Sequence, residues 1–284
     1  MENCEIKCHS SSKQLVKVHF FDRIVGRSLD EKLRNFCHIN CLKKNKIRNE
    51  KRSGRWGFIP ILGMTEAFSS LLALISFFIS IWKYQTMIKH KIHQTPMKRL
   101  YLIQFYTCCS AFLSSFMFHF RETTFTRNAD YFSAFGCILM SLLVAINRLV
   151  LLEKPEIHSN FAGVSLKIAI SYFIFHVYKM TCFEFDYFYN KIACGLMFFM
   201  SCICDFITFL NFRKHSHSKN IIYSISCLLL AGGIEILDIS PIFYLFDSHA
   251  VWHLLMAIST PYYYNFIAGE IDLHCPLVKL NKLE

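Results

Sequence analysis

Seven long apolar stretches, separated by polar segments, divide the chain. A hydrocarbon core of about 30 Å takes roughly 20 residues of helix, and each stretch has about that length. The pattern therefore predicts an all-α integral membrane protein, a seven-transmembrane helix bundle. The stretches lie at residues 61–82, 100–119, 131–152, 162–179, 191–210, 221–237 and 249–268.

Composition and charge agree with a membrane protein. Of the 284 residues, 54% are hydrophobic, 16% are aromatic and only 18% are charged, which is too apolar for an ordinary soluble domain. The formal net charge is +11, and 14 of the 31 lysines and arginines lie in residues 1–57. Basic segments beside a membrane account for this charge, so we expect no nucleic-acid partner.

The pattern divides the chain into three parts. They are a polar, cysteine-containing N-terminal segment at residues 1–57, a transmembrane domain at 58–270 and a short tail at 271–284. No apolar run in the first segment has the form of a cleavable signal peptide. We therefore expect either that the first transmembrane helix directs insertion or that the true start of the chain lies upstream.

Loop charges predict the orientation. The loops at 83–99, 148–160 and 211–219, together with the C-terminus, carry 12 lysines and arginines, whereas the alternate loops carry about four. By the positive-inside rule the first set faces the cytosol. Seven spans then place the N-terminal segment in the lumen and the C-terminal tail in the cytosol. The basic residues of the N-terminal segment argue against this, but long segments translocate with less regard to charge.

Four cysteines in the N-terminal segment form two C-x3-C pairs, Cys4 with Cys8 and Cys37 with Cys41. In an oxidising lumen they are expected to form two disulfides, with three possible connectivities. In the cytosol they would be free thiols or a zinc clip. The nine other cysteines lie mostly in apolar stretches, where a small buried hydrophobic side chain is the simplest role.

Histidines at the ends of apolar stretches indicate a metal site. His249 and His253 are four residues apart in D-S-H-A-V-W-H, and on a helix this spacing places both imidazoles on one face. Another stretch ends with Ser115 and His119, again four apart, and Asp130 follows at the start of the next. In the predicted orientation these side chains gather at the luminal membrane face.

Two longer segments around these residues are similar to a known family. The segment F-H-F-R-E-T-T-F-T-R-N-A-D-Y-F (118–132) resembles F-H-T-R-D-T-x-x-T-E-K-x-D-Y-F, and E-I-L-D-I-S-P-I-F-Y-L-F-D-S-H-A-V-W-H (235–253) resembles E-L-L-D-F-P-P-x-F-x-x-x-D-A-H-A-x-W-H. Weaker similarities lie at G-R-W-G-F (54–58), T-E-A (65–67) and F-D-Y-F-Y-N (185–190). These patterns resemble the Per-type post-GPI-attachment factors, which remodel the lipid of GPI-anchored proteins.

The resemblance implies a fold, a metal and an activity. The family belongs to a superfamily of seven-helix membrane hydrolases that includes alkaline ceramidases and the progestin and adiponectin receptors. It implies Zn²⁺ held by His119, His249 and His253, with Ser115 and Asp130 beside it as catalytic residues. The implied activity is that of a phospholipase in the Golgi or endoplasmic reticulum, which removes the sn-2 acyl chain of the GPI phospholipid of GPI-anchored proteins on the luminal side.

The chemistry of such a site suggests further roles. Zinc with three imidazole ligands and an open position activates water, and Asp130 could take the water's proton while Ser115 donates a hydrogen bond to the developing oxyanion. We expect Asp238 and Asp247 to hydrogen-bond the far nitrogens of the zinc histidines. Glu66 resembles the first-helix glutamate of the superfamily, which can help to bind a structural cation.

Simpler roles and other functions remain open at this point. A histidine at a helix end can be an interfacial residue, Asp130 can be a helix N-cap, and Ser115 can be a helix-packing contact. A ceramidase-like lipid amidase or a seven-helix receptor of the same superfamily would use similar residues. The F-H-F-R-E-T and D-S-H-A-V-W-H contexts favour GPI-lipid hydrolysis over both alternatives.

Overall fold

A computed structural model describes residues 2–14, 16–18, 20–24, 28–44, 56–183 and 185–280. Within these residues the regular structure is helical. Gly54 and Arg55 of the G-R-W-G-F segment, and residues 281–284 of the predicted tail, lie outside the described residues. The elements are α1 (Glu2–Ser11), α2 (Phe20–Ile24), α3 (Leu29–Lys44), α4 (Ala67–Lys83), a π-helical turn (Tyr84–Ile88), a 3₁₀ turn (Ile92–Gln94), α5 (Lys98–Phe120), α6 (Thr124–Glu153), α7 (Pro155–Cys182), α8 (Tyr187–Phe212), α9 (Ser218–Leu237) and α10 (Ser248–Leu280).

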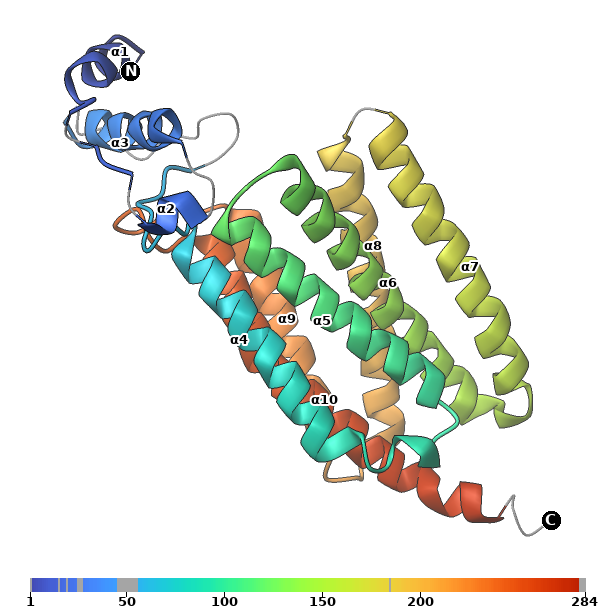
Figure 1. Cartoon of the computed structure of the whole chain (residues 1–284). Coiled ribbons are helices and arrows are strands. Elements are labelled where there is room, and N and C mark those ends of the chain that lie inside the picture. Colours follow the sequence, from blue (N-terminus) through green and yellow to red (C-terminus); the bar gives the residue numbers. More distant parts are fainter. Residues whose placement is uncertain are drawn as a thin grey trace.

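The long helices form one membrane-type bundle (Figure 1). Six helices of the described chain, α4 to α9, are long and apolar enough to cross a membrane, so the chain is a multi-pass membrane protein. Each predicted stretch falls on one of α4 to α10. The last helix, α10, packs along α9 and α4 but is not among the six, because its predicted span includes polar side chains such as His253, Thr260 and Asn265.

The first transmembrane helix begins later than the apolar pattern predicts. The pattern predicts a start at residue 61, whereas α4 starts at Ala67. Ile61 and Met64 instead pair through their backbones across a tight turn, with Leu62 and Gly63 both at positive φ. This turn carries the chain from the N-terminal segment into the bundle.

Local sequence signals set several of the other helix ends. Thr123 and Thr126 form a capping box at the start of α6, in which each side chain bonds the other residue's backbone N–H. The Asp186 carboxylate accepts a 2.8 Å hydrogen bond from the Tyr189 N–H and caps α8. Pro155 occupies the first turn of α7, where its missing N–H removes no helical hydrogen bond.

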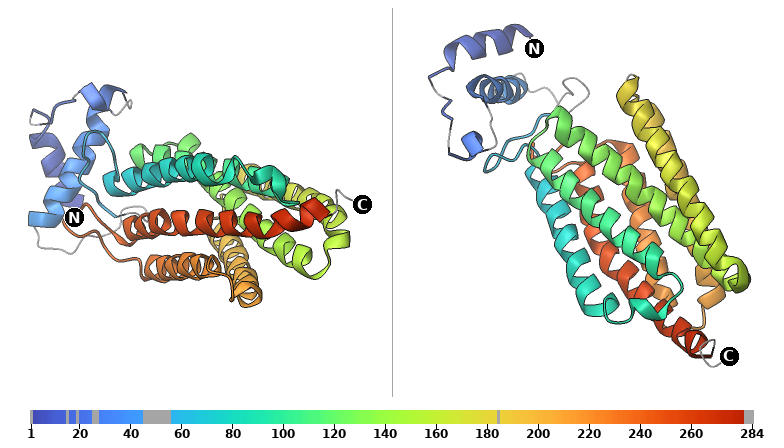
Figure 2. Two further views of the ribbon diagram at one scale, coloured as in Figure 1. Left: turned by 90° about the horizontal axis from the view of Figure 1, so that it is seen from below. Right: turned by 45° about the vertical axis from the view of Figure 1, so that its right-hand side comes forward.

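The largest buried apolar cluster of the described residues joins α5, α6, α7 and α10 with the turns between α4 and α5, and it includes Met97, Val144 and Ile271. Helix α7 packs against α6 at the edge of the bundle, as the right-hand view of Figure 2 shows. Its exposed apolar side chains, such as Ile168 and Ile174, suit a helix that faces lipid.

Two disulfides join the first and third helices of the N-terminal segment. Of the three possible connectivities, the structure has Cys4–Cys41 and Cys8–Cys37. Both pairs link α1 to α3, one helical turn apart. Eight of the nine other cysteines are free thiols, and the side chain of the ninth, Cys275, lies outside the described part of the chain.

The N-terminal segment packs on the end of the bundle where α5 finishes and α10 begins (Figure 1). The Asn35 side chain of α3 donates a 3.1 Å hydrogen bond to the Phe58 carbonyl. Arg121, which directly follows α5, forms a 3.4 Å ion pair with Glu31. The C-terminus lies at the opposite end of the bundle (Figure 1).

Candidate metal centre

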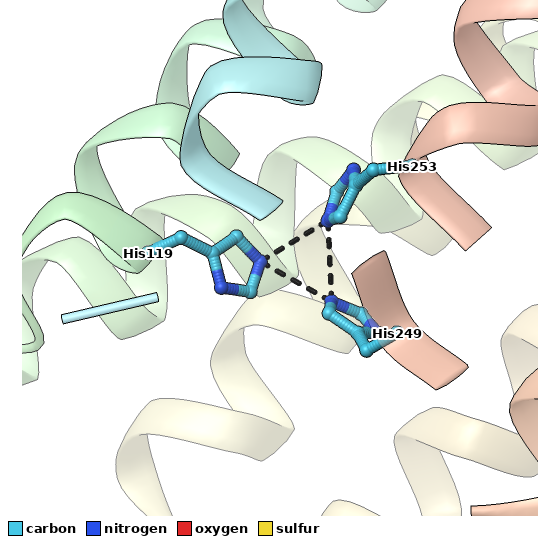
Figure 3. Close-up of side chains that lie close together, drawn as sticks. All are labelled: His119, His249 and His253. Atoms are coloured by element: carbon cyan, nitrogen blue, oxygen red, sulfur yellow. Dashed lines mark hydrogen bonds between the residues drawn. The ribbon is translucent and has the colours of Figure 1, made fainter. Parts of the chain in front are cut away.

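Three histidines from two helices meet at one end of the bundle. His119 lies in the last turn of α5, and His249 and His253 lie in the first two turns of α10. Their three Nε2 atoms point toward one another at 3.2 Å for each pair (Figure 3). His119 and His253 are buried, with 3% and 6% of their surfaces exposed, and His249 is half-buried.

This geometry fits a tetrahedral metal ion. With Zn–N bonds of about 2.0–2.1 Å, the nitrogens of a tetrahedral zinc site lie about 3.3–3.4 Å apart. The three Nε2 atoms are already close to that separation. Among the described histidine, cysteine and carboxylate side chains, these three histidines are the group that could hold a metal ion.

Two glutamates fix the direction of these imidazoles. Glu66 contacts His119 Nδ1 at 2.6 Å, and both carboxylate oxygens of Glu235 lie 3.1 Å from His249 Nδ1. An ionised carboxylate only accepts hydrogen bonds, so both Nδ1 atoms carry the proton and both Nε2 atoms present a lone pair. Lone pairs that face one another at 3.2 Å repel, and a cation between them removes that repulsion.

We predicted that Asp238 and Asp247 hydrogen-bond the far nitrogens of the zinc histidines. For His119 and His249 this is wrong, because Glu66 and Glu235 contact their Nδ1 atoms instead. Asp238 accepts a 2.9 Å hydrogen bond from the Trp56 indole at the edge of the N-terminal segment. Asp247 accepts a 2.8 Å hydrogen bond from the Ala250 N–H and so caps α10. Burial raises the pKa of the Asp247 carboxyl, partly offset by that hydrogen bond.

Glu66 is held to His119 through its backbone as well as its side chain. The Glu66 N–H donates to the His119 carbonyl at 3.0 Å, and the Thr65 N–H donates to the Phe120 carbonyl at 3.0 Å. The extended residues before α4 therefore run beside the last turn of α5. The structure places Glu66 as a hydrogen-bond partner of His119, and a structural cation at Glu66 stays a prediction.

Ser115 and Asp130 lie beside the histidines. Ser115 is buried one helical turn before His119, and Asp130 lies in the second turn of α6. The Asp130 carboxylate is close enough to Ser115, His119 and His249 to interact with them electrostatically. Thr123, not Asp130, caps α6, so the simpler role considered for this aspartate does not apply.

An apolar cavity lies inside the bundle, and its wall begins near this centre without including the three histidines. At the histidine end it is lined by Phe112, three residues before Ser115, and by Trp252, next to His253. It continues between the helices to Tyr101, Asp205 and Ile267.

The fold and the site define a class of protein: a multi-pass helical membrane protein with a buried three-histidine centre next to a serine and an aspartate. The model of the Per1-like family matches residues 31–271, a range that contains all of these side chains. The chain therefore belongs to the Per1-like family.

Relatives from three organisms align with most of the chain. "Protein PER1 homolog" of Schizosaccharomyces pombe is 29% identical over 276 residues, covering 94% of this chain and 82% of that protein. "Post-GPI attachment to proteins factor 3" of Drosophila melanogaster is 25% identical over 280 residues, covering 93% and 82%. "GPI-specific phospholipase A2-like PGAP3" of Danio rerio is 30% identical over 240 residues, covering 80% and 72%.

Proposed function

We propose that this protein remodels GPI anchors by hydrolysing the sn-2 acyl ester of the GPI phospholipid, with a zinc ion held by His119, His249 and His253. The observation that carries the proposal is the convergence of three Nε2 atoms close to Asp130, with an apolar cavity nearby in the bundle. The substrate class is supported by relatives that are named as a post-GPI attachment factor and as GPI-specific phospholipase A2-like proteins. GPI-anchored proteins would carry the lipid to the site.

The ligand set suits catalysis better than a purely structural role. Structural zinc sites use four protein ligands, whereas three imidazoles leave a position for water or substrate. When bound there, zinc would polarise the ester carbonyl and make a water molecule more acidic at neutral pH. Glu66 and Glu235 hold the imidazoles in the tautomer that binds metal, through the Nδ1 contacts at 2.6 and 3.1 Å.

Asp130 and Ser115 supply the proton transfer and the hydrogen bond that ester hydrolysis requires. Asp130 is a third carboxylate close to the histidines, and it could accept a proton from the attacking water while Glu66 and Glu235 hold the imidazoles. Ser115 can donate its hydroxyl hydrogen to the oxygen that becomes negative in the transition state. A serine nucleophile is disfavoured, because all three nearby histidines are used as metal ligands and none is free to activate it.

The proposed membrane arrangement follows the distribution of charge. We propose seven spans, α4 to α10, with the three-histidine end in the lumen of the Golgi or endoplasmic reticulum. The N-terminal segment, residues 1–57, would then be luminal, residues 58–270 would form the hydrolase domain and residues 271–284 would be cytosolic. The disulfides between α1 and α3 are consistent with an oxidising lumen.

The decisive experiment compares GPI lipids from cells with and without this protein by mass spectrometry. The proposal requires that sn-2 acyl chains normally removed from GPI-anchored proteins persist in the cells without it. An unchanged acyl composition would contradict remodelling. Purified protein should release fatty acid from a GPI lipid and not from a ceramide, whereas release from ceramide alone would identify a lipid amidase, and release from neither would favour a receptor.

A further inference from the structure

A second cluster of charged side chains is buried at the other end of the cavity. Arg148 of α6 and Glu270 of α10 have 0% and 2% of their surfaces exposed. Arg148 Nε lies 3.0 Å from both carboxylate oxygens of Glu270, and its Nη1 lies 2.6 Å from Asp205 Oδ1 of α8. The Tyr101 hydroxyl of α5 also hydrogen-bonds Glu270. The cluster, defined by these four residues, joins four helices and plays no part in the proposed chemistry.

The charged cluster lies where the cavity ends. Tyr101 and Asp205 are themselves part of the cavity wall, and Glu270 follows the lining residue Ile267 by one helical turn. Gln104, also in the wall, donates a 2.8 Å hydrogen bond to Tyr263 just before the cluster is reached. The far end of the wall thus combines apolar side chains, such as Ile88 and Ile267, with the charged side chain of Asp205.

We propose that the charged cluster is a fixed end wall that limits the length of the acyl chain accepted by the site. The inference rests on the proposed function, since it concerns the acyl chain of the lipid to be cleaved. In this proposal the cavity is closed at its far end and accepts acyl chains only up to a maximum length. Arg148, Glu270 and Asp205 act here by excluding methylene groups, not by touching the reacting ester.

Helix geometry gives the size of this limit. From His253 to Ile267 there are 14 residues, which correspond to about 21 Å along α10 at 1.5 Å per residue. A zig-zag chain advances by about 1.25 Å for each C–C bond of about 1.5 Å, so this length takes on the order of 16 carbons. It also exceeds one leaflet of the hydrocarbon core, which is about 15 Å thick.

An ionic end wall is harder to displace than an apolar one. Apolar side chains can change rotamer to admit an extra methylene group. Arg148 cannot move away from Glu270 and Asp205 without leaving charges buried and unpaired, which is strongly unfavourable. A longer chain would therefore have to bend or leave its end outside the cavity, and its ester would sit poorly at the metal centre.

The test uses cavity variants whose effects on chain length are opposite. Ser141 lines the cavity 11 residues beyond Asp130 on α6, at a depth of about 16 Å, so Ser141→Phe should shorten the accepted chain to about 13 carbons. Ile267→Ala removes side-chain carbons one helical turn before Glu270 and should admit only slightly longer chains, because the charged cluster behind it stays in place. Ser171→Phe adds the same ring at an exposed position on α7, which is not part of the cavity wall, and serves as the matched control.

Synthetic GPI lipids with sn-2 chains of about 12, 16 and 20 carbons would be given to each purified protein, and fatty-acid release measured. We expect Ser141→Phe to lower release of the longest chain relative to the shortest on the order of tenfold or more, since one methylene misfit in a closed pocket is worth about that much. Ile267→Ala should shift the preference the other way, and Ser171→Phe should keep the wild-type profile.

Binding of free fatty acids of the same lengths, measured by native mass spectrometry, provides a second readout. It distinguishes failure of this inference from failure of the proposed function. Active protein whose Ser141→Phe and Ile267→Ala variants keep the wild-type chain-length profile would overturn the end wall while leaving GPI-lipid hydrolysis intact. If no variant cleaves any GPI lipid, the length dependence of fatty-acid binding still decides the question, and binding without length dependence would refute the inference.

Discussion

The two ring nitrogens of His119 connect three parts of the candidate metal centre. Its Nε2 faces the two histidines of α10, while its Nδ1 contacts Glu66 before α4. The sequence predicts the three histidines, because their spacing and their places at the ends of apolar stretches are visible in it. It did not identify Glu66 and Glu235 as their partners, although both are ionisable groups in or beside membrane segments, where such groups are usually functional.

Loss of one histidine should remove both the metal and the activity. His249→Ala leaves two imidazoles, and a site with two protein ligands holds zinc poorly. Zinc content of the purified protein, measured by inductively coupled plasma mass spectrometry, should fall from about one ion per chain to near zero. His215→Ala, at an exposed loop position, is the matched control and should keep the metal. Full zinc in His249→Ala would show that the ligand assignment is wrong.

The Glu235 carboxylate, which contacts His249 Nδ1, should raise metal affinity without being a ligand itself. Glu235→Gln keeps the shape of the side chain but removes the charge that favours the Nδ1–H tautomer. Affinity for zinc, measured by competition with a chelator, should fall about 10- to 100-fold. Glu153→Gln, at the exposed end of α6, makes the same change away from the site. Equal affinities in the two variants would mean that Glu235 has no influence on the metal.

Substitution of Asp130 should lower the hydrolysis rate without loss of the bound metal. Asp130→Asn keeps the size of the side chain and can still bond Ser115, but an amide cannot take a proton from water. Zinc should remain near stoichiometric while the hydrolysis rate falls on the order of 10²-fold or more. Ser115→Ala should lose less, since it removes one hydrogen-bond donor rather than the base. Full activity in Asp130→Asn would place the base elsewhere.

At the scale of whole elements, apolar length predicts the helices well but not the connections between them. Each predicted stretch lies on one of the long helices, since a run of about 20 apolar residues is a direct requirement of the membrane. The segment between α9 and α10 is different. Asp238, Phe243 and Tyr244 all adopt positive φ there, and no periodic pattern encodes such a reversal. That reversal brings Glu235, rather than Asp247, to His249.

The two disulfides should stabilise the N-terminal segment and not the bundle. The paired substitution Cys8→Ser and Cys37→Ser removes one crosslink between α1 and α3 and should cost about 2–4 kcal/mol in the local free energy of unfolding. Hydrogen exchange should rise in α1 and α3 and stay unchanged in α5 and α6. Cys182→Ser, which replaces an exposed free thiol, is the control. Labelling of all four cysteines in unreduced, unfolded wild-type protein would contradict the crosslinks.

For the whole molecule, the two ends of the bundle have different characters. The histidine end carries the N-terminal segment, whereas the opposite end carries the C-terminus and the basic loop between α4 and α5 (Figure 1). This separation along the bundle axis was predictable, because chain order and span length alone decide which loops share a side. Which side faces the lumen depends on charge, and here the basic loops and the basic N-terminal segment favour opposite orientations.

Glycosylation mapping should settle that orientation. An Asn-x-Ser acceptor introduced near Ser12 should be modified if the histidine end is luminal, and one introduced near Ser216 in the loop between α8 and α9 should not. The readout is a mass shift that a glycosidase removes. Modification near Ser216 alone would invert the orientation and place the three histidines on the cytosolic face, away from a luminal GPI lipid.

The position of two metal ligands on α10 has a consequence for biosynthesis. His119 is synthesised early, but His249 and His253 belong to the last helix, so the three nitrogens cannot meet until nearly the whole chain has left the ribosome. A chain terminated before α10 retains a single imidazole at this site and cannot form the centre. In the proposed function, metal loading is therefore tied to completion of the polypeptide, and partially synthesised protein in the membrane would be inactive.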